Sequence, residues 1–427
     1  MEPVWIAGIV LLVCMLLKVP VFVSMIVGSA AYFMLMPNIA SHIAVQRFTS
    51  GLESVPLLAA PFFICAGTFM NYCGVTPRIM KIATILTGRM PGGLAQANVT
   101  LSLLMSGLCA SNLADAAMEA RIMVPEMEKQ GLPKAFSTVV TAFSAVIVPL
   151  IPPGVAMILY GALASVSIGK LFISGISIGL FVYVWLLLLT LLISIKRGYK
   201  PYRTEKATAK ELFHAVSKSA LALFLPIIII GGIRIGVFTP TEAGAVAVLY
   251  TIILGLYYKE LDRTKFIAAL KDSAITIGAV MLIVGSSAVF AWIITREQVP
   301  QRTAAWLLET TDNKYAFLIG VNIFLLIIGM FFEGTSLLII LVPLLAPIAN
   351  AYGIDPIQFA FIFIFNLSIG AITPPLGTLM FVTCSVTGCK TKDFYKESIP
   401  YFGVFLIILA CITFIPGITT AILKLFY

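Results

Sequence analysis

The sequence predicts an all-α polytopic integral membrane protein with two inverted repeats, each holding a re-entrant helical hairpin and a proline-broken helix. Three observations predict this class. First, hydrophobic residues make up 60 % of the 427 residues and charged residues 11 %, whereas soluble domains are roughly 45–50 % apolar and about 25 % charged. Second, long charge-free runs follow one another along the chain. Third, two of these runs carry a tandem proline at matching positions. The mean hydropathy of +1.04 agrees with a lipid environment.

Charge and cysteine content exclude several other classes. The net charge of +9 (28 basic minus 19 acidic residues) is concentrated in residues 196–218. Basic residues of membrane proteins collect in cytoplasmic loops, so we predict a cytoplasmic loop there, with a possible amphipathic helix at its end, and no nucleic-acid partner. The seven cysteines form no CxxC pair and the two histidines lie apart. We therefore expect free thiols, no zinc site and no cofactor.

Charge-free runs give the predicted spans, because a helix needs about 20 apolar residues to cross the hydrocarbon. Run 3–17 follows Met1-Glu2 without a basic region, which favours a retained first span over a cleaved signal peptide. The remaining runs are 19–46, 54–77, 90–114, 135–169, 171–195, 219–233, 243–258, 273–295, 315–332, 334–354, 356–389 and 398–423.

Runs 135–169 and 356–389 are too long for simple spans. A straight helix of this length would measure about 50 Å, against about 30 Å of hydrocarbon. Each run contains a proline pair, Pro152–Pro153 or Pro374–Pro375, and a helix interior does not tolerate two missing N–H donors. Broken backbone at membrane depth must line a cavity, bind a ligand or, as the simpler alternative, be satisfied by neighbouring helices.

The two broken runs belong to an internal duplication with a constant offset, since 374 − 152 = 222. The same offset relates further punctuating residues: Gly107 and Gly329, Pro125 and Pro347, Gly131 and Gly353, and Lys170 and Lys392. Four simple spans and one broken span separate the last two lysines. An odd number of crossings places them on opposite membrane faces, so we predict inverted repeats.

Each repeat also contains a predicted re-entrant hairpin, at 94–123 and 315–350. Small and polar residues interrupt each hairpin near its middle, and Ser111-Asn112 overlays Glu333-Gly334 under the same offset. Inverted repeats with paired discontinuous helices are typical of secondary transporters with a site near the midplane. The resulting division is scaffold at 1–93, transport repeat 1 at 94–169, scaffold at 170–314, transport repeat 2 at 315–392 and a C-terminal scaffold helix at 393–427.

Each hairpin tip facing its own proline break would form a cage of oxygens suited to sodium. Most ligands would be backbone carbonyls, which the prolines release from helical hydrogen bonds. The first cage would use Ser111, Asn112, Val148 and Ile151. The second would use Glu333, Gly334, Gly370 and Thr373.

The helix N-termini released at Pro152, Pro153, Pro374 and Pro375 would direct positive dipole ends inward, which suits an anionic substrate. Ionisable residues inside a membrane segment are functional candidates, and we name Asp115 and Arg121 as substrate residues. Two alternatives remain open. Asp115 and Glu119 would mark the hairpin's emergence at the membrane surface, or Arg121 would pair with Glu119 or Glu126.

An enzyme is a remote alternative. The chain contains no HExxH and no Walker A motif, so neither a zinc hydrolase nor direct use of ATP is indicated.

The chain resembles the large membrane (M-type) subunit of tripartite ATP-independent periplasmic (TRAP) transporters over essentially its whole length. The resemblance is carried by the segments 54–64, Gly92-Gly93-Leu94-Ala95, Ile151-Pro152-Pro153, Phe238-Thr239-Pro240-Thr241-Glu242-Ala243-Gly244 and Thr373-Pro374-Pro375-Leu376-Gly377. It implies a sodium-driven, elevator-type importer of organic anions in the bacterial inner membrane. It also implies a small four-helix membrane subunit and a periplasmic substrate-binding protein as partners. Substrates in this family include sialic acid, other sugar acids and C4-dicarboxylates. A stand-alone divalent-anion:sodium symporter is the alternative transporter class.

Two residues receive specific expectations. Glu242 follows Thr239-Pro240, which is typical of a helix start, so we favour a structural role over ion coupling. Thr373 offers a hydroxyl beside the second break, either to sodium or back to its own helix.

Overall fold

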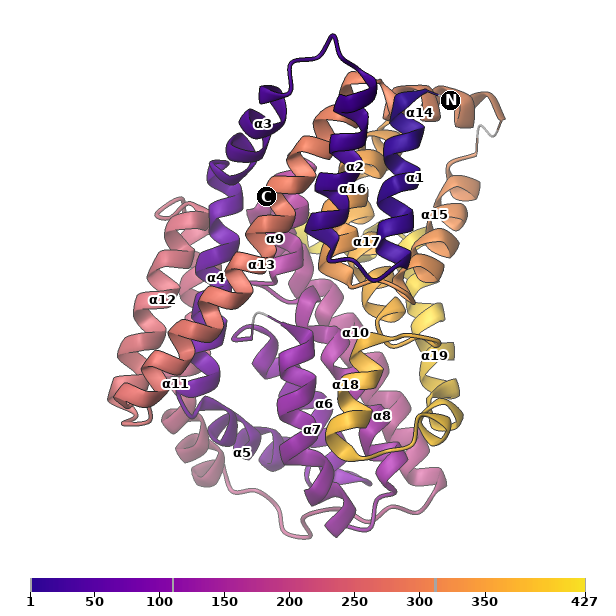
Figure 1. The fold of residues 1–427 in the computed structure, drawn as a ribbon. Helices are drawn as coiled ribbons and strands as arrows, with labels where there is room; N and C mark the ends of the chain where they lie inside the picture. The colour runs from indigo at the N-terminus through magenta and orange to yellow at the C-terminus, as the bar shows by residue number, and fades with distance from the viewer. Residues whose placement is uncertain (1, 110, 311–312, 427) are drawn as a thin grey trace.

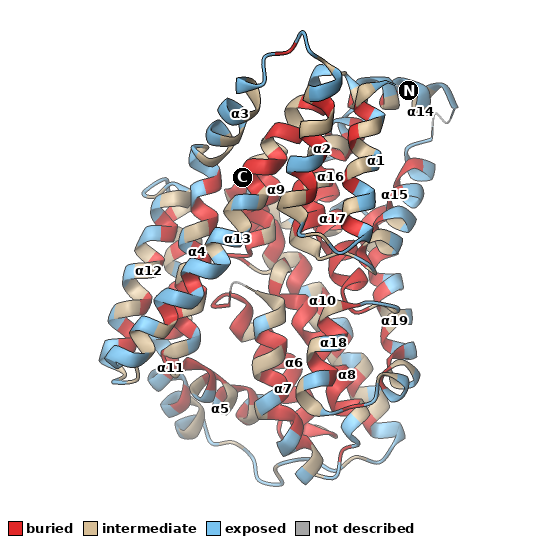
Figure 2. Ribbon diagram, in the orientation of Figure 1, coloured by how far each residue is buried: buried red, intermediate tan, exposed pale blue. Residues whose placement is uncertain are grey.

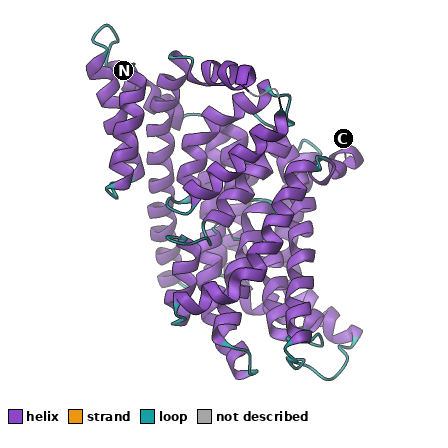
Figure 3. Ribbon diagram, turned by 90° about the vertical axis from the view of Figure 1, so that its right-hand side faces the viewer, coloured by secondary structure: helices purple, strands orange, loops and turns teal. Residues whose placement is uncertain are grey.

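The computed structural model describes residues 2–109, 111–310 and 313–426, and every secondary-structure element in these ranges is a helix (Figures 1 and 3). Seven helices are long and apolar enough to cross a membrane, or up to eight when a bent pair is counted as one span. The prediction of an all-α polytopic protein is confirmed.

The N-terminal part differs from the predicted spans in one place. It contains α1 (Pro3–Leu16), α2 (Val21–Leu35), α3 (His42–Leu52), α4 (Val55–Tyr72) and α5 (Val75–Thr87). The run 19–46 is therefore not one span, because α2 ends at Leu35. Pro37 has no N–H and disfavours helical geometry in the residue before it, and Met36 accordingly has φ −120° and ψ 71°.

The next segment forms a helical hairpin followed by a broken helix. Its elements are α6 (Gly93–Ser106), α7 (Asn112–Lys129), α8 (Lys134–Ser144), the 3-10 helix η1 (Ala145–Leu150) and α9 (Val155–Leu163). The break falls at Pro152–Pro153, as predicted, and the two parts are bent by 42°. Residues 145–150 tighten into a 3-10 helix before the break.

Long helices follow, separated by the predicted polar loop. They are α10 (Ile168–Lys196), α11 (Ala209–Arg234), α12 (Pro240–Tyr257), α13 (Arg263–Arg296) and α14 (Val299–Thr310). Residues 209–218 form the start of α11, in agreement with the possible helix predicted at the end of the stretch 196–218. Thr208 caps this helix by accepting a hydrogen bond from the N–H of Glu211, and both guanidinium NH groups of Arg203 donate to the Glu211 carboxylate at 2.9 Å.

The second hairpin and broken helix occupy the last third of the chain. The elements are α15 (Lys314–Gly329), α16 (Gly334–Ala351), α17 (Pro356–Gly370), α18 (Thr378–Thr387), α19 (Thr391–Phe414) and α20 (Gly417–Phe426). Seven non-helical residues, 371–377, separate α17 from α18 around Pro374–Pro375. The predicted span 398–423 is not continuous, because helix α19 ends just before Pro416 and α20 starts after it.

The two hairpin-and-break segments pack into one body. Helix α18 of the second segment packs against α7 and α8 of the first, α17 packs against η1, and α16 packs against α9. Buried residues concentrate along these central helices, while α3, α11, α12 and α15 expose much of their surface (Figure 2). That outer surface is apolar, as at Ile227 and Leu249, which are 60 % and 61 % exposed. Such side chains are expected to face lipid.

The start of α12 confirms the predicted helix start at Thr239-Pro240, where Glu242 caps the helix. Its carboxylate accepts hydrogen bonds from the N–H of Thr239 at 2.7 Å and from the Thr239 hydroxyl at 2.8 Å, and the Thr239 hydroxyl accepts from the N–H of Glu242. This reciprocal capping box satisfies donors that a helix N-terminus leaves unpaired.

Candidate functional site

Both hairpin tips are helix N-termini closed by a capping side chain. Ser111 accepts a hydrogen bond from the N–H of Ala114 at the start of α7. The carboxylate of Glu333 accepts from the N–H groups of Thr335 and Ser336 at 2.9 and 2.8 Å, at the start of α16. The two capping residues correspond under the sequence offset, since 333 − 111 = 222. The duplication therefore places equivalent helix starts at equivalent positions.

The second tip touches the second break directly through backbone atoms. A Cβ added at Gly370 would lie 2.7 Å from the Cα and 2.8 Å from the carbonyl carbon of Gly329. Real Cβ atoms do not approach this closely, so position 370 needs glycine for this contact, whereas a Cβ at Gly329 would lie 3.2 Å from the Cα of Gly370 and be tight. The hairpin α15–α16 is thus held against the end of α17 by a glycine–glycine contact.

A cavity of about 60 Å³ lies where both tips and both breaks meet. A space of this size accommodates water-sized molecules or ions. Its described lining comes from α7, η1, α9, α16, α17, the second break and α18: Asn112, Leu113, Pro149, Ala156, Glu333, Gly334, Thr335, Leu338, Ile364, Leu367, Ser368, Ala371 and Thr378. Elements from opposite ends of the sequence therefore build one site.

Four helix N-termini point at this cavity. Asn112, Gly334 and Thr378 are the first residues of α7, α16 and α18, and Ala156 is the second residue of α9. A helix N-terminus carries roughly half a positive elementary charge. Four of them in one place favour a bound anion. Carbonyl-bearing helix ends also reach the cavity at Pro149 and Ala371, and they supply oxygen ligands for a cation.

Three of the eight predicted sodium ligands line the cavity: Asn112, Glu333 and Gly334. The other five, Ser111, Val148, Ile151, Gly370 and Thr373, lie on the same tips and breaks but outside the described lining. Sequence reasoning missed Thr335, Ser368 and Thr378. Thr335 directly follows a predicted tip and Thr378 opens the helix after a predicted break. The tip and the break therefore predicted the positions of Thr335 and Thr378, whereas no sequence pattern marks Ser368.

The carbonyls at the second break are not free, contrary to expectation. The Gly370 carbonyl accepts from the N–H of Thr373 at 3.0 Å, and the Ala371 carbonyl accepts from the N–H of Leu379 at 2.9 Å. The backbone of 371–377 folds back on itself and so replaces the helical donors. Because a carbonyl oxygen has two lone pairs, one hydrogen bond leaves room for a cation.

The Thr373 hydroxyl donates to the Ile369 carbonyl at 2.7 Å. The hydroxyl hydrogen is therefore directed to its own helix, which is one of the two arrangements that the sequence predicted. The hydroxyl oxygen keeps its lone pairs for a cation. The geometry is compatible with both roles.

The predicted substrate residues do not gather in the cavity. Pro152 and Pro153 are buried beside it, Pro374 is half-buried and Pro375 is exposed. Arg121 is exposed on the side of α7 away from the buried carboxylates. The two carboxylates expected as alternative partners of Arg121, those of Glu119 and Glu126, make other contacts. Glu126 pairs with Lys129 at 2.6 Å, and Glu119 accepts from uncharged side chains.

Asp115 and Glu119 are buried among the surrounding helices, at 1 % and 0 % exposed. Oε2 of Glu119 accepts from the Asn98 amide at 3.0 Å and from the Ser102 hydroxyl at 2.7 Å. This polar cluster lies inside the α6–α7 hairpin, where helix packing and not sequence position determines burial.

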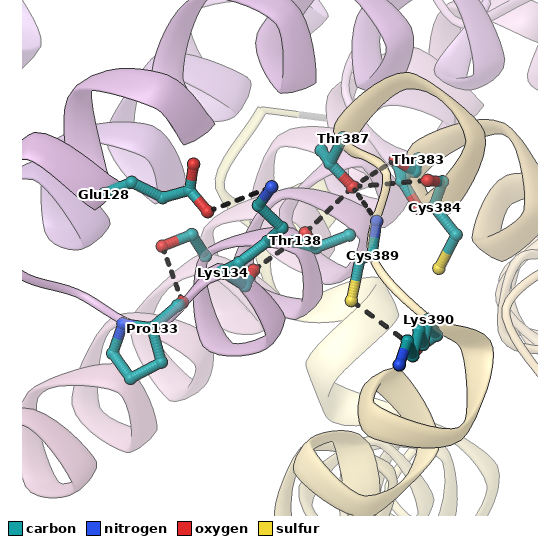
Figure 4. Close-up of polar contacts among 10 residues, drawn as sticks. Glu128, Pro133, Lys134, Thr138, Thr383, Cys384, Thr387, Cys389 and Lys390 are labelled. Atoms are coloured by element: carbon teal, nitrogen blue, oxygen red, sulfur yellow. Dashed lines mark hydrogen bonds and ion pairs between the residues drawn. The ribbon is translucent and has the colours of Figure 1, made fainter.

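The two repeats are also linked at the end of the broken helices that is far from the cavity (Figure 4). The Thr138 hydroxyl of α8 donates to the Thr387 hydroxyl of α18 at 3.1 Å. Lys134 pairs with Glu128 across the α7–α8 turn at 3.5 Å. The two repeats therefore contact each other at both ends of the broken helices.

Comparisons with known proteins agree with this architecture. The family model described as "Tripartite ATP-independent periplasmic transporter, DctM component" matches residues 9–418. The sialic acid TRAP transporter large permease protein SiaM of Vibrio cholerae is 38 % identical over 408 residues, which are 95 % of each chain. The C4-dicarboxylate TRAP transporter large permease protein DctM of Pseudomonas aeruginosa is 34 % identical over 92 % of each chain.

A solved structure shares the fold. The Alcanivorax borkumensis YdaH transporter superposes with a TM-score of 0.61 at 15 % identity, covering 87 % of each chain. With homologues that are transport permeases and at least seven apolar helices, the protein is a multi-pass component of the inner membrane and not an enzyme. The chain belongs to the large-permease (DctM) family of tripartite ATP-independent periplasmic transporters.

Proposed function

We propose that this chain imports a small organic anion by sodium-coupled secondary active transport. The single observation that carries the proposal is the cavity where both hairpin tips and both broken helices meet. Four positive helix ends favour an anion there. Carbonyls and hydroxyls at the same place favour a sodium ion, and a bound sodium would offset the negative charge of Glu333 beside the anion.

The substrate class follows from the site and from the relatives together. The two relatives named above are permeases for sialic acid and for C4-dicarboxylates, and both substrates are carboxylates. A carboxylate suits helix N-termini, because backbone N–H groups bind its oxygens. The cavity of about 60 Å³ is smaller than a sugar acid, so substrate entry requires the tips to separate.

The mechanism we propose is an elevator movement. The body formed by 94–169 and 315–392 would carry the cavity across the membrane, while 1–93, 170–314 and 393–427 would remain as the scaffold against lipid. The family's tripartite name supports two partners, a small four-helix membrane subunit and a periplasmic substrate-binding protein that delivers the substrate. Packing of α18 on α7 and α8 supports movement of the repeats as one unit.

Uptake into proteoliposomes tests the proposal. The chain is reconstituted with the small subunit, and labelled sialic acid or a labelled C4-dicarboxylate is added with its binding protein. We expect uptake that requires an inward sodium gradient and the binding protein. Full uptake by this chain alone in potassium would refute the coupling and the partner requirement together.

A further inference from the structure

Glu119 lies in the interior of the first hairpin with an incomplete set of partners. Its Oε2 accepts two hydrogen bonds, from the amide of Asn98 and the hydroxyl of Ser102. Its Oε1 has no hydrogen-bond partner among the described residues, although the side chain is fully buried. A buried, unpaired carboxylate oxygen is costly. Burial of this oxygen therefore requires a group other than the described side chains, such as a bound ion, a water molecule or a proton.

The Asn98 amide lies between two hydroxyl groups and the Glu119 carboxyl group. Its Oδ1 accepts from the Thr141 hydroxyl at 3.1 Å, and its Nδ2 also donates to the Ser144 hydroxyl at 2.9 Å. Rotating the amide would turn its Oδ1 toward Oε2 of Glu119 and lose the hydrogen bond between Nδ2 and the carboxyl group. Asn98 therefore presents a hydrogen-bond donor to Glu119, together with Ser102.

A second carboxylate lies one turn away. Asp115 is four residues before Glu119, so the two side chains share one face of α7. Asp115 is 1 % exposed, and neither of its oxygens has a hydrogen-bond partner among the described residues. Two ionised carboxylates this close in an apolar interior repel each other strongly.

The surrounding elements supply no compensating cation. Helix α7 packs against α6, η1, α8 and α18. Described residues of α6 and η1 include no titratable side chain, and α18 contributes the thiol of Cys384. Lys134 of α8 is at the far end of that helix and pairs with Glu128. Cys109, before α7, directs its thiol to the Asn71 side-chain oxygen at 3.4 Å.

Basic residues of α7 and of the neighbouring helix α5 are also turned elsewhere. Arg121 and Lys81 are exposed. Arg78 stacks over the ring of Tyr258, 4.1 Å from its centroid, and Lys129 pairs with Glu126. The field at Glu119 is therefore set by Asp115 and by neutral dipoles.

We propose that Glu119 is a proton-binding site inside the transport body, with the proton on Oε1. A proton there neutralises the buried carboxylate, whose charge is the costly part of its burial, and removes the repulsion with Asp115. A sodium ion fits less well, because the Asn98 amide and the Ser102 hydroxyl direct hydrogens, and not lone pairs, toward the carboxylate. The site is separate from the cavity, whose lining reaches α7 at Asn112 and Leu113. Its consequence for uptake rests on the proposed transport function.

Infrared spectroscopy of the purified chain in lipid nanodiscs tests the site without transport. We expect a protonated-carboxyl C=O band near neutral pH that is lost in Glu119→Gln. The matched control Glu126→Gln, an exposed residue in a salt bridge, should keep the band. Ser102→Ala retains the carboxyl and removes one donor, so the band should remain and move to higher frequency. This variant keeps the test usable if Glu119→Gln does not fold.

Three results would overturn the proposal. These are a wild-type spectrum without the band, a band unchanged in Glu119→Gln, or a band that sodium chloride removes and potassium chloride does not. The last result would make Glu119 a sodium ligand. In proteoliposomes at a fixed sodium gradient, wild-type uptake should vary across neutral pH, and Glu119→Gln uptake should not. Absence of any uptake with the band present would refute the transport function and leave the proton site intact.

Discussion

The contact between Gly329 and Gly370 should control closure of the second hairpin. In Gly370→Ala, the new Cβ would lie 2.7, 2.8 and 3.0 Å from the Cα, carbonyl carbon and carbonyl oxygen of Gly329. All three are backbone atoms, so no side-chain rotation relieves the overlap. Overpacking of this kind costs roughly 1–3 kcal/mol.

This overpacking would destabilise the closed arrangement of the second hairpin, in which the tip at Glu333 and the break at Ala371 line one cavity. If sodium binds there, its apparent affinity should fall by about 5- to 140-fold, because every 1.4 kcal/mol corresponds to roughly a factor of ten. The assay is a sodium titration of uptake in proteoliposomes, combined with thermal unfolding in detergent.

Gly320→Ala is the matched control. Gly320 lies on the exposed side of α15, the helix that carries the contact partner Gly329, and a Cβ at Gly320 meets no atom within 4 Å. It should leave the sodium dependence unchanged. Sodium curves that coincide for wild type, Gly370→Ala and Gly320→Ala would refute the reasoning that hairpin closure forms the ion site.

Three further predictions follow from single side chains. Thr373→Val removes an oxygen beside the second break and the hydrogen bond to Ile369, so we expect a higher sodium concentration for half-maximal uptake. Thr373→Ser keeps the hydroxyl and should behave like wild type. If the sodium titrations of wild type and both variants coincide, Thr373 has no role in the site. Glu242→Gln weakens the capping box with Thr239, so the yield of folded protein on size exclusion should drop. Normal yield with altered sodium coupling would contradict this. Glu333→Gln keeps one capping oxygen but removes the charge that offsets a bound cation. The free energy of sodium binding should therefore fall by more than the free energy of unfolding measured without sodium. Equal losses of the two free energies would assign Glu333 to capping alone.

Features that depend on local chemistry were predictable from the sequence. A proline pair removes two N–H donors wherever it stands, so the breaks at Pro152–Pro153 and Pro374–Pro375 appear where expected. Glu242 follows a threonine and a proline, and its capping box forms between residues three apart. The apolar composition alone required a bilayer.

Features that depend on packing between distant segments appear only in the tertiary structure. Nothing in the sequence around Glu119 shows that α6, α8 and α18 cover its face of α7, because burial depends on neighbours up to about 270 residues away along the chain. The same holds for the cavity, where α7 and α9 meet α16 and α18. The sequence by itself determined where the helices start, break and end, since those events involve atoms within one turn. The tertiary structure decided which of those ends share a site and which carboxylates are removed from water.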